Sequence, residues 1–333
     1  MKAIICTAYG PPDVLKLQEV EKPYPKDEQV LIRVHATSVT RADCEIRRFD
    51  FPGWVAFPIR LWLGILKPRV RILGQEFAGE VEAVGKDVTS FVPGDRVFGT
   101  TGMKLGAYAE YLCLDQLSPG SVLASLPTIM SYAQAAVIPY GASEALQFLR
   151  KGNLKAGHKI LIVGAGGSFG TFAVQLAKYF GAEITAVDSA SKLEMLCSLG
   201  AHYVIDYTRG DFTGSKKTFD IIFDVVGKTP FTHLLRMLRP GGRYVIANPH
   251  TSHLIRGLWT MLTSDRKVIF GSDSSSVEHL QYIKELVEDG KLQPVIDRSY
   301  PLEQIAEAHR YAETEQKKGN IVITVTQTKN QER

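Results

Sequence analysis

The spacing of apolar residues changes near residue 128, which divides the chain into two parts of different texture. Before this point, short runs that alternate apolar and polar positions are separated by turn residues such as Pro93-Gly94-Asp95. Alternation with a period of two is typical of strands with one buried face, so we expect a β-rich domain here. The strands expected in it are Val30 to His35, Glu80 to Val84, Arg96 to Gly99 and Ala107 to Leu114.

After residue 128, longer helical patterns alternate with continuous apolar runs. Such runs are typical of parallel strands that helices cover on both faces, so the α/β alternation predicts a doubly wound parallel sheet. The six strands expected are Ile160 to Val163, Glu183 to Val187, Tyr203 to Ile205, Ile221 to Val225, Tyr244 to Ala247 and Val268 to Phe270. A helix from Val277 to Glu288, a helix through Tyr311 and a last strand from Ile321 to Val325 follow. Because a closing strand most simply returns to the β-rich part, we expect residues 1–127 and 272–333 to form one domain and residues 128–271 the other.

A glycine-rich turn joins the first of these six strands to a helix expected from Phe169 to Phe180. Glycine lacks a Cβ, so backbone amides in such a turn can approach a pyrophosphate, and the helix start adds unpaired N–H groups and a favourable dipole. The turn departs from the full G-x-G-x-x-G pattern, because Ala165, Gly167 and Gly170 form a variant with alanine first. Its place between a strand and a helix nevertheless predicts a dinucleotide-binding domain.

The residues after the second strand bear on which dinucleotide binds. Asp188 stands at about the spacing where an acid binds the adenosine ribose hydroxyls, which favours NAD(H). Ser189 and Lys192 would instead suit a 2′-phosphate, which favours NADP(H). The residues leave both cofactors open.

Composition is that of an ordinary globular protein, with 45% hydrophobic and 22% charged residues among 333 and a net charge of +4. The basic residues are spread, which indicates no nucleic-acid partner. One local basic stretch is either a solvated rim or an attraction for an anionic ligand; it comprises Arg47, Arg48, Arg60, Lys67, Arg69 and Arg71. Four widely spaced cysteines without a C-x-x-C pair favour free thiols in a reducing cytoplasm.

The longest apolar stretch, Trp54 to Leu66, is interrupted by Pro58, Arg60 and Gly64. It is too short and too interrupted to span a bilayer. Two interpretations stay open for it: a packed loop or helix, or an apolar wall or lid over a substrate pocket.

Several motifs spread over the whole chain match one enzyme family. They include Gly74-Gln-Glu-Phe-Ala-Gly-Glu-Val, Pro93-Gly-Asp-Arg-Val-Phe-Gly, Gly106-Ala-Tyr-Ala-Glu-Tyr, Leu238-Arg-Pro-Gly-Gly-Arg and the glycine-rich turn. In these motifs the chain resembles the medium-chain dehydrogenase/reductase superfamily, specifically its zinc-free quinone oxidoreductase-like branch. The resemblance implies a GroES-like fold for the β-rich catalytic domain, a Rossmann fold for the other, a nicotinamide cofactor that is commonly NADPH, and a homodimer.

In alcohol dehydrogenases of this superfamily, cysteine and histidine hold a catalytic zinc. At the matching positions, Thr40 replaces the first cysteine and Gln75 replaces the histidine. A hydroxyl and a neutral amide cannot supply the soft or imidazole ligands that zinc needs, so we expect no metal. We expect Glu76 to be structural and hydrogen-bonded, and His250 and His253 to be solvated loop residues.

Without a metal, hydride transfer must rely on positioning, desolvation and hydrogen bonds to the developing charge. A quinone or an α,β-unsaturated carbonyl suits this mechanism, because the acceptor spreads the charge onto its oxygen. We therefore expect a zinc-independent NAD(P)H-dependent oxidoreductase with a small apolar quinone or enone as substrate. Two alternatives stay open: a metal-free alcohol or aldehyde dehydrogenase, and a non-catalytic nucleotide-binding module that senses redox state.

The resemblance implies catalytic roles for Thr40, Asp43 and Arg47 on the nicotinamide and substrate side. Relatives carry an asparagine where Thr40 stands and often a tyrosine where Glu45 stands, so the proton donor stays open. Asp43 is either catalytic or a buried helix cap, and Ser143 is either a nicotinamide ribose contact or a helix N-cap.

The other cofactor contacts come from the turn and from strand ends, where open sheets bind ligands, or from weaker family matches. They are Ala165, Gly166, Gly167, Ser168, Phe169, Gly170, Asp188, Ser189, Lys192, Tyr207, Val225, Val226, Gly227, Asn248, Phe270, Ser272 and Asn320.

Overall fold

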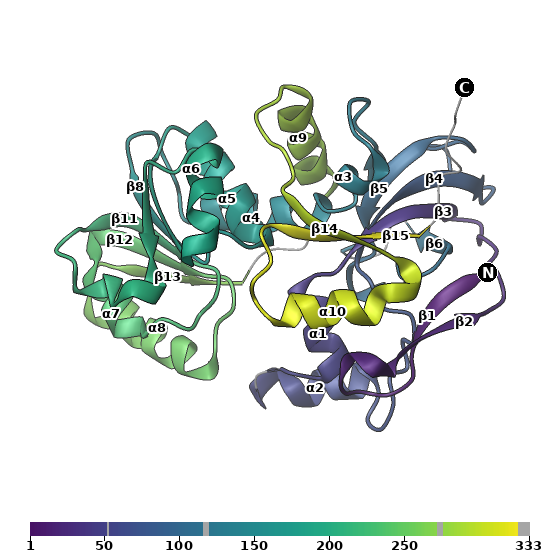
Figure 1. Ribbon diagram of the computed structural model, residues 1–333, viewed down its shortest axis with the longest axis horizontal. Coiled ribbons are helices and arrows are strands. Elements are labelled where there is room, and N and C mark those ends of the chain that lie inside the picture. Colours follow the sequence, from purple (N-terminus) through teal and green to yellow (C-terminus); the bar gives the residue numbers. More distant parts are fainter. Residues whose placement is uncertain (52, 116–119, 272–275, 326–333) are drawn as a thin grey trace. The chain divides into compact units, whose positions relative to one another are not determined.

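The computed structural model of the chain describes residues 1–51, 53–115, 120–271 and 276–325. The chain forms two compact units, and each has hydrophobic clusters of its own (Figure 1). Unit 1 comprises the described residues of Met1–Tyr140, Ser274–Asp289 and Ile296–Arg333. Unit 2 comprises those of Gly141–Asp273 and Gly290–Val295.

Unit 1 is built on two sheets. The smaller pairs β1 (Lys2–Cys6) with β2 (Leu15–Glu19). The larger contains β3 (Gln29–Ser38), β4 (Glu76–Val84), β5 (Arg96–Thr100), β6 (Tyr111–Asp115), β7 (Val122–Ser125), β14 (Ile296–Pro301) and β15 (Asn320–Thr324). Its order is β14-β15-β3-β4-β5-β7, and β6 also pairs with β3. The last strand therefore joins a sheet begun near residue 29, as expected for a closing strand that returns to the β-rich part.

Alternating residues of β3 explain how the larger sheet forms. Val30, Ile32 and Val34 are buried and pack in one cluster with Phe77 and Val81 of β4. Burying one face of both strands fixes their register, because a shift by one residue would turn every apolar side chain outward.

The strand expected from Ala107 to Leu114 is wrong in its first half. The strand β6 begins at Tyr111, and Ala109 makes only an isolated bridge to Ala3. The backbone before β6 bonds elsewhere: Ile4 N donates to Tyr108 O at 2.8 Å, and Tyr108 N donates to Leu73 O at 2.9 Å. Tyr108 therefore lies in the cluster that contains Ile4 and Leu73 and not in the cluster built on β3.

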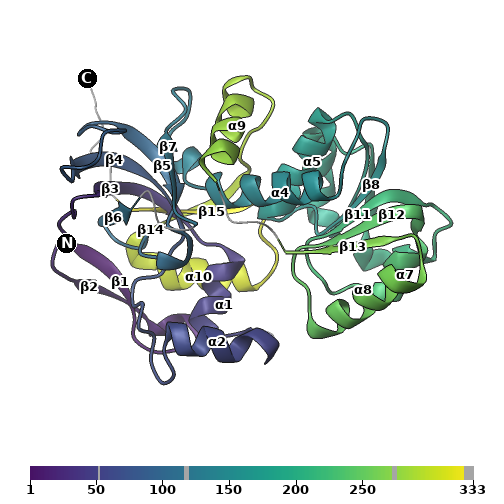
Figure 2. The ribbon, with the colours of Figure 1, turned by 180° about the vertical axis from the view of Figure 1, so that it is seen from behind.

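The helices of unit 1 are α1 (Arg41–Arg48), α2 (Gly53–Leu63), α3 (Tyr132–Ala135), α9 (Val277–Glu288) and α10 (Ile305–Glu313). The apolar stretch from Trp54 to Leu66 is therefore helical as far as Leu63, and Pro58 lies inside the helix. One hydrophobic cluster joins Ile46 of α1, Leu63 of α2 and Ala308 of α10. Figures 1 and 2 both show α1 next to α10, with α2 on the far side of α1 from β15.

Unit 2 contains one six-stranded sheet in which every pair is parallel. Its strands are β8 (Lys159–Val163), β9 (Glu183–Asp188), β10 (Tyr203–Asp206), β11 (Phe219–Asp224), β12 (Leu238–Ile246) and β13 (Lys267–Phe270). The order is β10-β9-β8-β11-β12-β13. The expected doubly wound fold is confirmed, and the strand order reverses direction between β8 and β11, where such sheets bind ligands.

Helices cover both faces of this sheet (Figure 1). On one face lie α4 (Pro139–Lys151), which begins in unit 1, α5 (Ser168–Tyr179) and α6 (Leu193–Leu199); on the other lie α7 (Phe231–Arg236) and α8 (Thr251–Thr263). Among the described residues, no helix has the length and apolar character needed to cross a membrane.

Candidate active site

The glycine-rich turn between β8 and α5 has the shape of a phosphate cradle. Gly164 has φ +80°, and a Cβ there would come 2.3 Å from Val226 Cγ2. At Gly170 a Cβ would come 2.4 Å from Gly164 O, so neither position accepts a side chain. Gly167 differs, because the nearest atom to its added Cβ would be 3.8 Å away. Gly167 is also the N-cap of α5 and supplies no side-chain cap, which leaves this open side of the helix start suited to an anion.

Asp188 and Lys192 form an ion pair beside this turn. Lys192 Nζ lies 3.1 Å from Asp188 Oδ1, and each side chain is only 7% exposed. Asp188 also accepts hydrogen bonds from Gly166 N at 2.7 Å and Ser189 N at 2.8 Å. Sequence analysis took Asp188 and Lys192 to favour different cofactors, but the two side chains form an ion pair. Asp188 also holds the backbone of the turn through Gly166 N.

The loop that carries Tyr207 is tied to the loop that carries Ser189. Hydrogen bonds from Thr208 are the main cause that lowers the pKa of Asp206, and the backbone of Ala190 contributes to the same effect. Tyr207 follows directly and is exposed. The expected adenosine-side residues Asp188, Ser189, Lys192 and Tyr207 therefore belong to adjoining strand ends.

The end of β11 forms the other side of the sheet's reversal point. Asp224 is fully buried and accepts hydrogen bonds from Gly227 N at 2.8 Å, Val226 N at 3.1 Å and the Tyr244 hydroxyl at 3.0 Å. Burial raises the pKa of Asp224. Asn248 Nδ2 donates to Val225 O at 2.6 Å. The expected Val225, Val226, Gly227 and Asn248 thus come together, and Val226 lies against Gly164.

Sequence analysis missed Asp224, although a signal was present. Like Asp188, it is an acid at the last position of an apolar parallel strand. Both carboxylates accept backbone N–H groups from the loop that follows or adjoins the strand, so this pattern marks residues that hold the loops at the strand ends.

Three other expected cofactor residues lie outside the glycine-rich turn and the loops that follow β9 and β11. Ser143 lies inside α4, which begins at Pro139, so its interpretation as an N-cap is wrong. The Phe270 ring packs closely against Gly257 of α8. Asn320 is buried at the start of β15 in unit 1. Ser272 lies outside the described residues.

In unit 1, Thr40 and Asp43 form a reciprocal cap at the start of α1. Asp43 Oδ2 accepts from Thr40 Oγ1 at 2.6 Å and from Thr40 N at 2.9 Å, while Asp43 N donates to Thr40 Oγ1 at 3.2 Å. Asp43 has no solvent exposure, and burial raises its pKa to about 6, although hydrogen bonds with Thr40 and Tyr108 oppose the shift. The helix-cap interpretation of Asp43 is confirmed.

Behind this cap lies a buried polar cluster that includes Arg47. The hydroxyl of Tyr108 lies 3.2 Å from His309 Nε2, and Arg47 Nε donates to His309 Nδ1 at 3.4 Å. Burial and the charge of Arg47 lower the pKa of His309 to about 3, so its imidazole is neutral. Arg47 also donates to Gly10 O and to the Glu313 carboxylate. These contacts join α1 to α10 and favour a structural role for Arg47.

Sequence analysis did not assign Tyr108 or His309. Tyr108 stands in the quoted Gly106-Ala-Tyr motif, but nothing in the sequence indicates that α10 brings a histidine to its hydroxyl. This contact joins residues 201 positions apart.

The positions that match zinc ligands carry side chains other than cysteine and histidine. The Thr40 hydroxyl donates to Asp43, and Gln75 is a buried neutral amide. Glu76 accepts from Ser38 Oγ and from Tyr140 N at 2.7 Å, which confirms that this carboxylate is hydrogen-bonded within the protein. The described residues contain no group of three His, Cys, Asp or Glu side chains arranged for a metal. This donor set does not fit zinc.

His253 is not a solvated loop residue as expected. Its side chain is buried in α8, and its Nδ1 accepts from His250 N at 3.0 Å, so the two histidines form the start of that helix. All four cysteines are free thiols, as expected.

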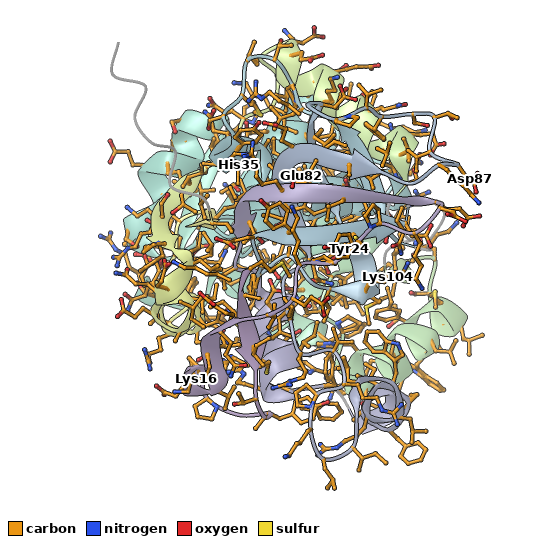
Figure 3. All side chains as sticks on the ribbon, turned by 90° about the vertical axis from the view of Figure 1, so that its right-hand side faces the viewer. Lys16, Tyr24, His35, Glu82, Asp87 and Lys104 are labelled. Atoms are coloured by element: carbon orange, nitrogen blue, oxygen red, sulfur yellow. The ribbon has the colours of Figure 1, made fainter. Side chains whose placement is uncertain are left out.

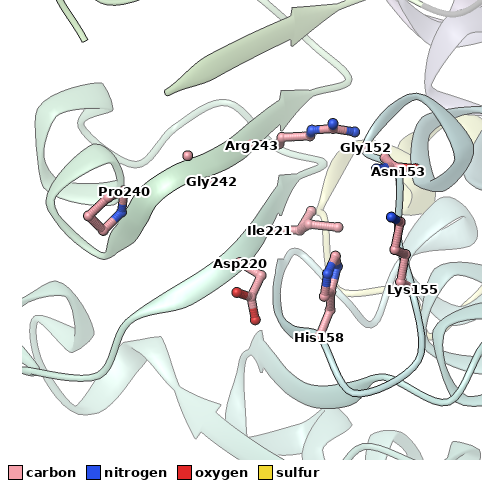
Figure 4. Close-up of a pocket in the computed structure, with 10 residues that line it drawn as sticks. Gly152, Asn153, Lys155, His158, Asp220, Ile221, Pro240, Gly242 and Arg243 are labelled. Atoms are coloured by element: carbon pink, nitrogen blue, oxygen red, sulfur yellow. The ribbon is translucent and has the colours of Figure 1, made fainter. Parts of the chain in front are cut away.

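A pocket of about 180 Å³ lies at the opposite edge of the unit 2 sheet, near the amino ends of β8 and β11 (Figure 4). Lys155, His158, Asp220 and Arg243 are among its lining residues. None of the expected cofactor residues lines it.

Comparison with known proteins agrees with this geometry. Residues 26–123 match the alcohol dehydrogenase GroES-like domain, and residues 199–323 match the zinc-binding dehydrogenase family. The chain is 31% identical to 2-methylene-furan-3-one reductase from Solanum lycopersicum, over 97% of this chain and 79% of that protein. It is 32% identical to quinone oxidoreductase from Homo sapiens, over 93% of both chains.

The chain belongs to the medium-chain dehydrogenase/reductase superfamily. Within it, the likeness is to the quinone oxidoreductase branch: the structure of the quinone oxidoreductase from Coxiella burnetii superimposes with a TM-score of 0.87 at 31% identity, covering 98% of this chain and 99% of that one. The family and the fold class that sequence analysis expected are confirmed.

Proposed function

We propose that this chain is an NAD(P)H-dependent oxidoreductase that reduces quinones or α,β-unsaturated carbonyls without a metal. The proposal rests on Thr40, a hydroxyl at a position where metal-dependent relatives bind zinc, held by the buried Asp43. The names of the relatives, a quinone oxidoreductase and a furanone reductase, support the same substrate class.

The open side of the glycine turn suits the pyrophosphate of the cofactor. Gly167 provides room at the start of α5, and Gly164 and Gly170 give the turn its path. The Asp188 and Lys192 pair would lie at the adenosine ribose, where Lys192 favours the 2′-phosphate of NADPH. When bound, the nicotinamide supplies a hydride to the substrate carbon.

Thr40 and Asp43 are suited to manage the accompanying proton. Thr40 Oγ1 and Asp43 Oδ2 share a hydrogen bond of 2.6 Å, and the pKa of Asp43 is raised to about 6. Protonation of Asp43 reverses the direction of this hydrogen bond: Asp43 then donates to Thr40, and Thr40 passes its own proton to the substrate oxygen as negative charge develops there. A hydride on carbon and a proton on oxygen complete a two-electron reduction, and Asp43 regains its proton from water.

The test follows NADPH and NADH oxidation at the nicotinamide absorbance with a quinone, an enone and a saturated aldehyde in parallel, with a chelator present. We expect chelator-resistant turnover of the quinone or enone. Turnover of the aldehyde alone would support a metal-free aldehyde dehydrogenase, and cofactor binding without any turnover would support a non-catalytic module.

A matched pair of variants tests the role of the hydroxyl. Thr40→Val keeps the shape of the side chain but removes the hydroxyl, so we expect kcat to fall by about a hundredfold or more, as removal of a general acid predicts. Thr40→Ser keeps the hydroxyl and should retain most of the activity. Equal activity of both variants would exclude Thr40 as the proton donor.

We also propose that the chain forms a homodimer and that it lies in the cytoplasm. Among the described strands, β13 is an edge of the unit 2 sheet and presents backbone groups that a second copy can pair. Sedimentation equilibrium would measure the mass of the assembly directly.

A further inference from the structure

The segment from α2 to Leu66 presents large apolar side chains to solvent. We call these five residues the α2 surface: Phe57, Leu61, Trp62, Ile65 and Leu66. Phe57 is 72% exposed and Leu66 is 87% exposed. Contiguous exposed apolar groups of this size mark interaction sites in globular proteins.

The α2 surface rests on a fixed support. Leu63 is buried in the cluster that α1 and α10 also form. The Tyr9 hydroxyl donates to Gly64 O at 2.9 Å, and Arg60 Nε donates to Ile65 O at 2.9 Å. The Arg60 guanidinium also lies 4.4 Å from the centre of the Phe49 ring. The outward direction of the five apolar side chains is therefore part of the folded structure of unit 1.

The charged residues within the segment that carries the α2 surface all have one sign. From residue 51 to residue 75 the sequence contains no Asp or Glu, and Lys67, Arg69 and Arg71 are exposed immediately after Leu66. None of these three takes part in a salt bridge with any residue that the structure describes. The three form a cationic rim of the apolar surface.

Another face of unit 1 has a different arrangement of charges. Figure 3 presents a side where Glu82, Asp87 and Lys104 are labelled. There Glu82 pairs with Lys22, and Lys104 pairs with Asp115 at 3.3 Å, so charges of both signs alternate and compensate.

We propose that the α2 surface docks on an anionic lipid membrane. Aromatic and aliphatic side chains enter the boundary between headgroups and acyl chains, and nearby lysine and arginine attract anionic headgroups. The absence of acids between residues 51 and 75 is what such a surface requires. A second copy of the chain is a poorer partner, because a symmetric contact would bring the cationic rims of the two copies together.

The test is flotation of the purified full chain with vesicles of phosphatidylcholine, with and without phosphatidylglycerol, at low and high salt. We expect binding to the anionic vesicles at low salt and its loss at high salt. Binding to neutral vesicles that does not depend on salt would overturn the proposal.

Variants locate the contact. Lys67→Gln with Arg71→Gln should weaken binding by about 25-fold, since each basic residue near an anionic surface contributes about fivefold. The matched control, Lys155→Gln with Lys216→Gln, removes the same charge from exposed sites in unit 2 and should bind as the wild type does. Equal weakening by both pairs would mean that only net charge matters, which contradicts a defined surface.

The apolar part has its own pair of variants. Leu66→Ser should weaken binding by about tenfold or more, from the transfer free energy of a leucine side chain. Leu262→Ser removes another highly exposed leucine, 76% exposed against 87% for Leu66, from α8 in unit 2 and should leave binding unchanged. Weakening by Leu262→Ser alone would assign the contact to α8 and overturn the proposal.

Two further measurements test other roles of the α2 surface. If Leu66→Ser dissociates an oligomer and no form of the protein floats with vesicles, the surface is an interface between copies. If Leu66→Ser raises KM for a water-soluble acceptor and no form floats, the surface is a pocket wall. Either result overturns the lipid contact, and circular dichroism confirms that each variant is folded.

Discussion

The Asp43 carboxyl group has a structural role as a helix cap and a proposed role in proton transfer. It caps α1 through Thr40, yet it is completely buried, so its ionised form is stabilised only by hydrogen bonds. Burial outweighs those bonds and raises its pKa to about 6. The free energy of unfolding and the proposed proton transfer should therefore both change with pH as the Asp43 carboxyl group titrates.

This shift predicts how stability depends on pH. Because the pKa of Asp43 is higher in the folded protein than its unperturbed value of 3.8, the folded state binds the proton more tightly. The stabilisation is full below pH 3.8 and is lost as pH rises through about 6, a change of about 3 kcal/mol in the free energy of unfolding. Urea unfolding from pH 4 to pH 7 should show this loss in the wild type and not in Asp43→Asn. Asp87→Asn, in an exposed turn, is the control; parallel curves for all three proteins would refute the assignment.

Lys192 and Asp188 set the charge beside the turn as a pair. Lys192→Met leaves the Asp188 carboxylate without its cation, so the site should repel a 2′-phosphate. We expect the affinity for NADPH to fall about tenfold or more and the affinity for NADH to change little. Fluorescence titration with both cofactors measures this, with Lys216→Met as a control of equal charge. An equal loss for both cofactors would show that the pair only supports the fold.

Among the elements, the junction of β8 and α5 contains glycines with different tasks. A Cβ on Gly170 would meet backbone atoms of Gly164 and Ala165 within about 2.5 Å, which cannot move aside without changing the turn. A Cβ on Gly167 would enter open space where we place the phosphates.

The two alanine variants should therefore separate folding from binding. Gly170→Ala should lower the free energy of unfolding by about 1–3 kcal/mol, as overpacking does, and also weaken NADPH binding. Gly167→Ala should leave the unfolding transition unchanged and weaken NADPH binding alone. Thermal unfolding and cofactor titration on both variants check this; normal NADPH affinity in Gly167→Ala would move the phosphate site elsewhere.

At the scale of the whole molecule, unit 1 is assembled from segments that lie far apart in the sequence. Unit 1 begins at Met1 but includes β15, whose Ile321, Val322 and Ile323 are fully buried between β14 and β3. It also includes His309 of α10, which contacts the buried Arg47. Unit 1 therefore cannot complete its core until the last strand is present.

Truncation after Val295 should disrupt unit 1 and spare unit 2. It removes β14, α10 and β15 and leaves Arg47 without His309 and Glu313, and an unpaired buried charge alone costs about 3–5 kcal/mol. It keeps Gly290–Val295, the last segment of unit 2. We expect loss of quinone reduction and of the near-ultraviolet circular dichroism of unit 1, with NADPH binding retained. Retained quinone reduction would contradict the central role of β15.

The amino-acid sequence determined the strands and helices wherever one periodicity governed a long run, because burying a face in such a run requires only local alternation. The six parallel strands and α9 follow from that pattern, and the glycine turn follows from its glycines and its place between a strand and a helix. Tertiary structure decided what local patterns do not encode: the partner of Asp188, the neutral state of His309 beneath Tyr108, and the path of residues 107–110 along β1. Each depends on groups far apart in the chain, whose burial and charge exist only when the fold brings them together.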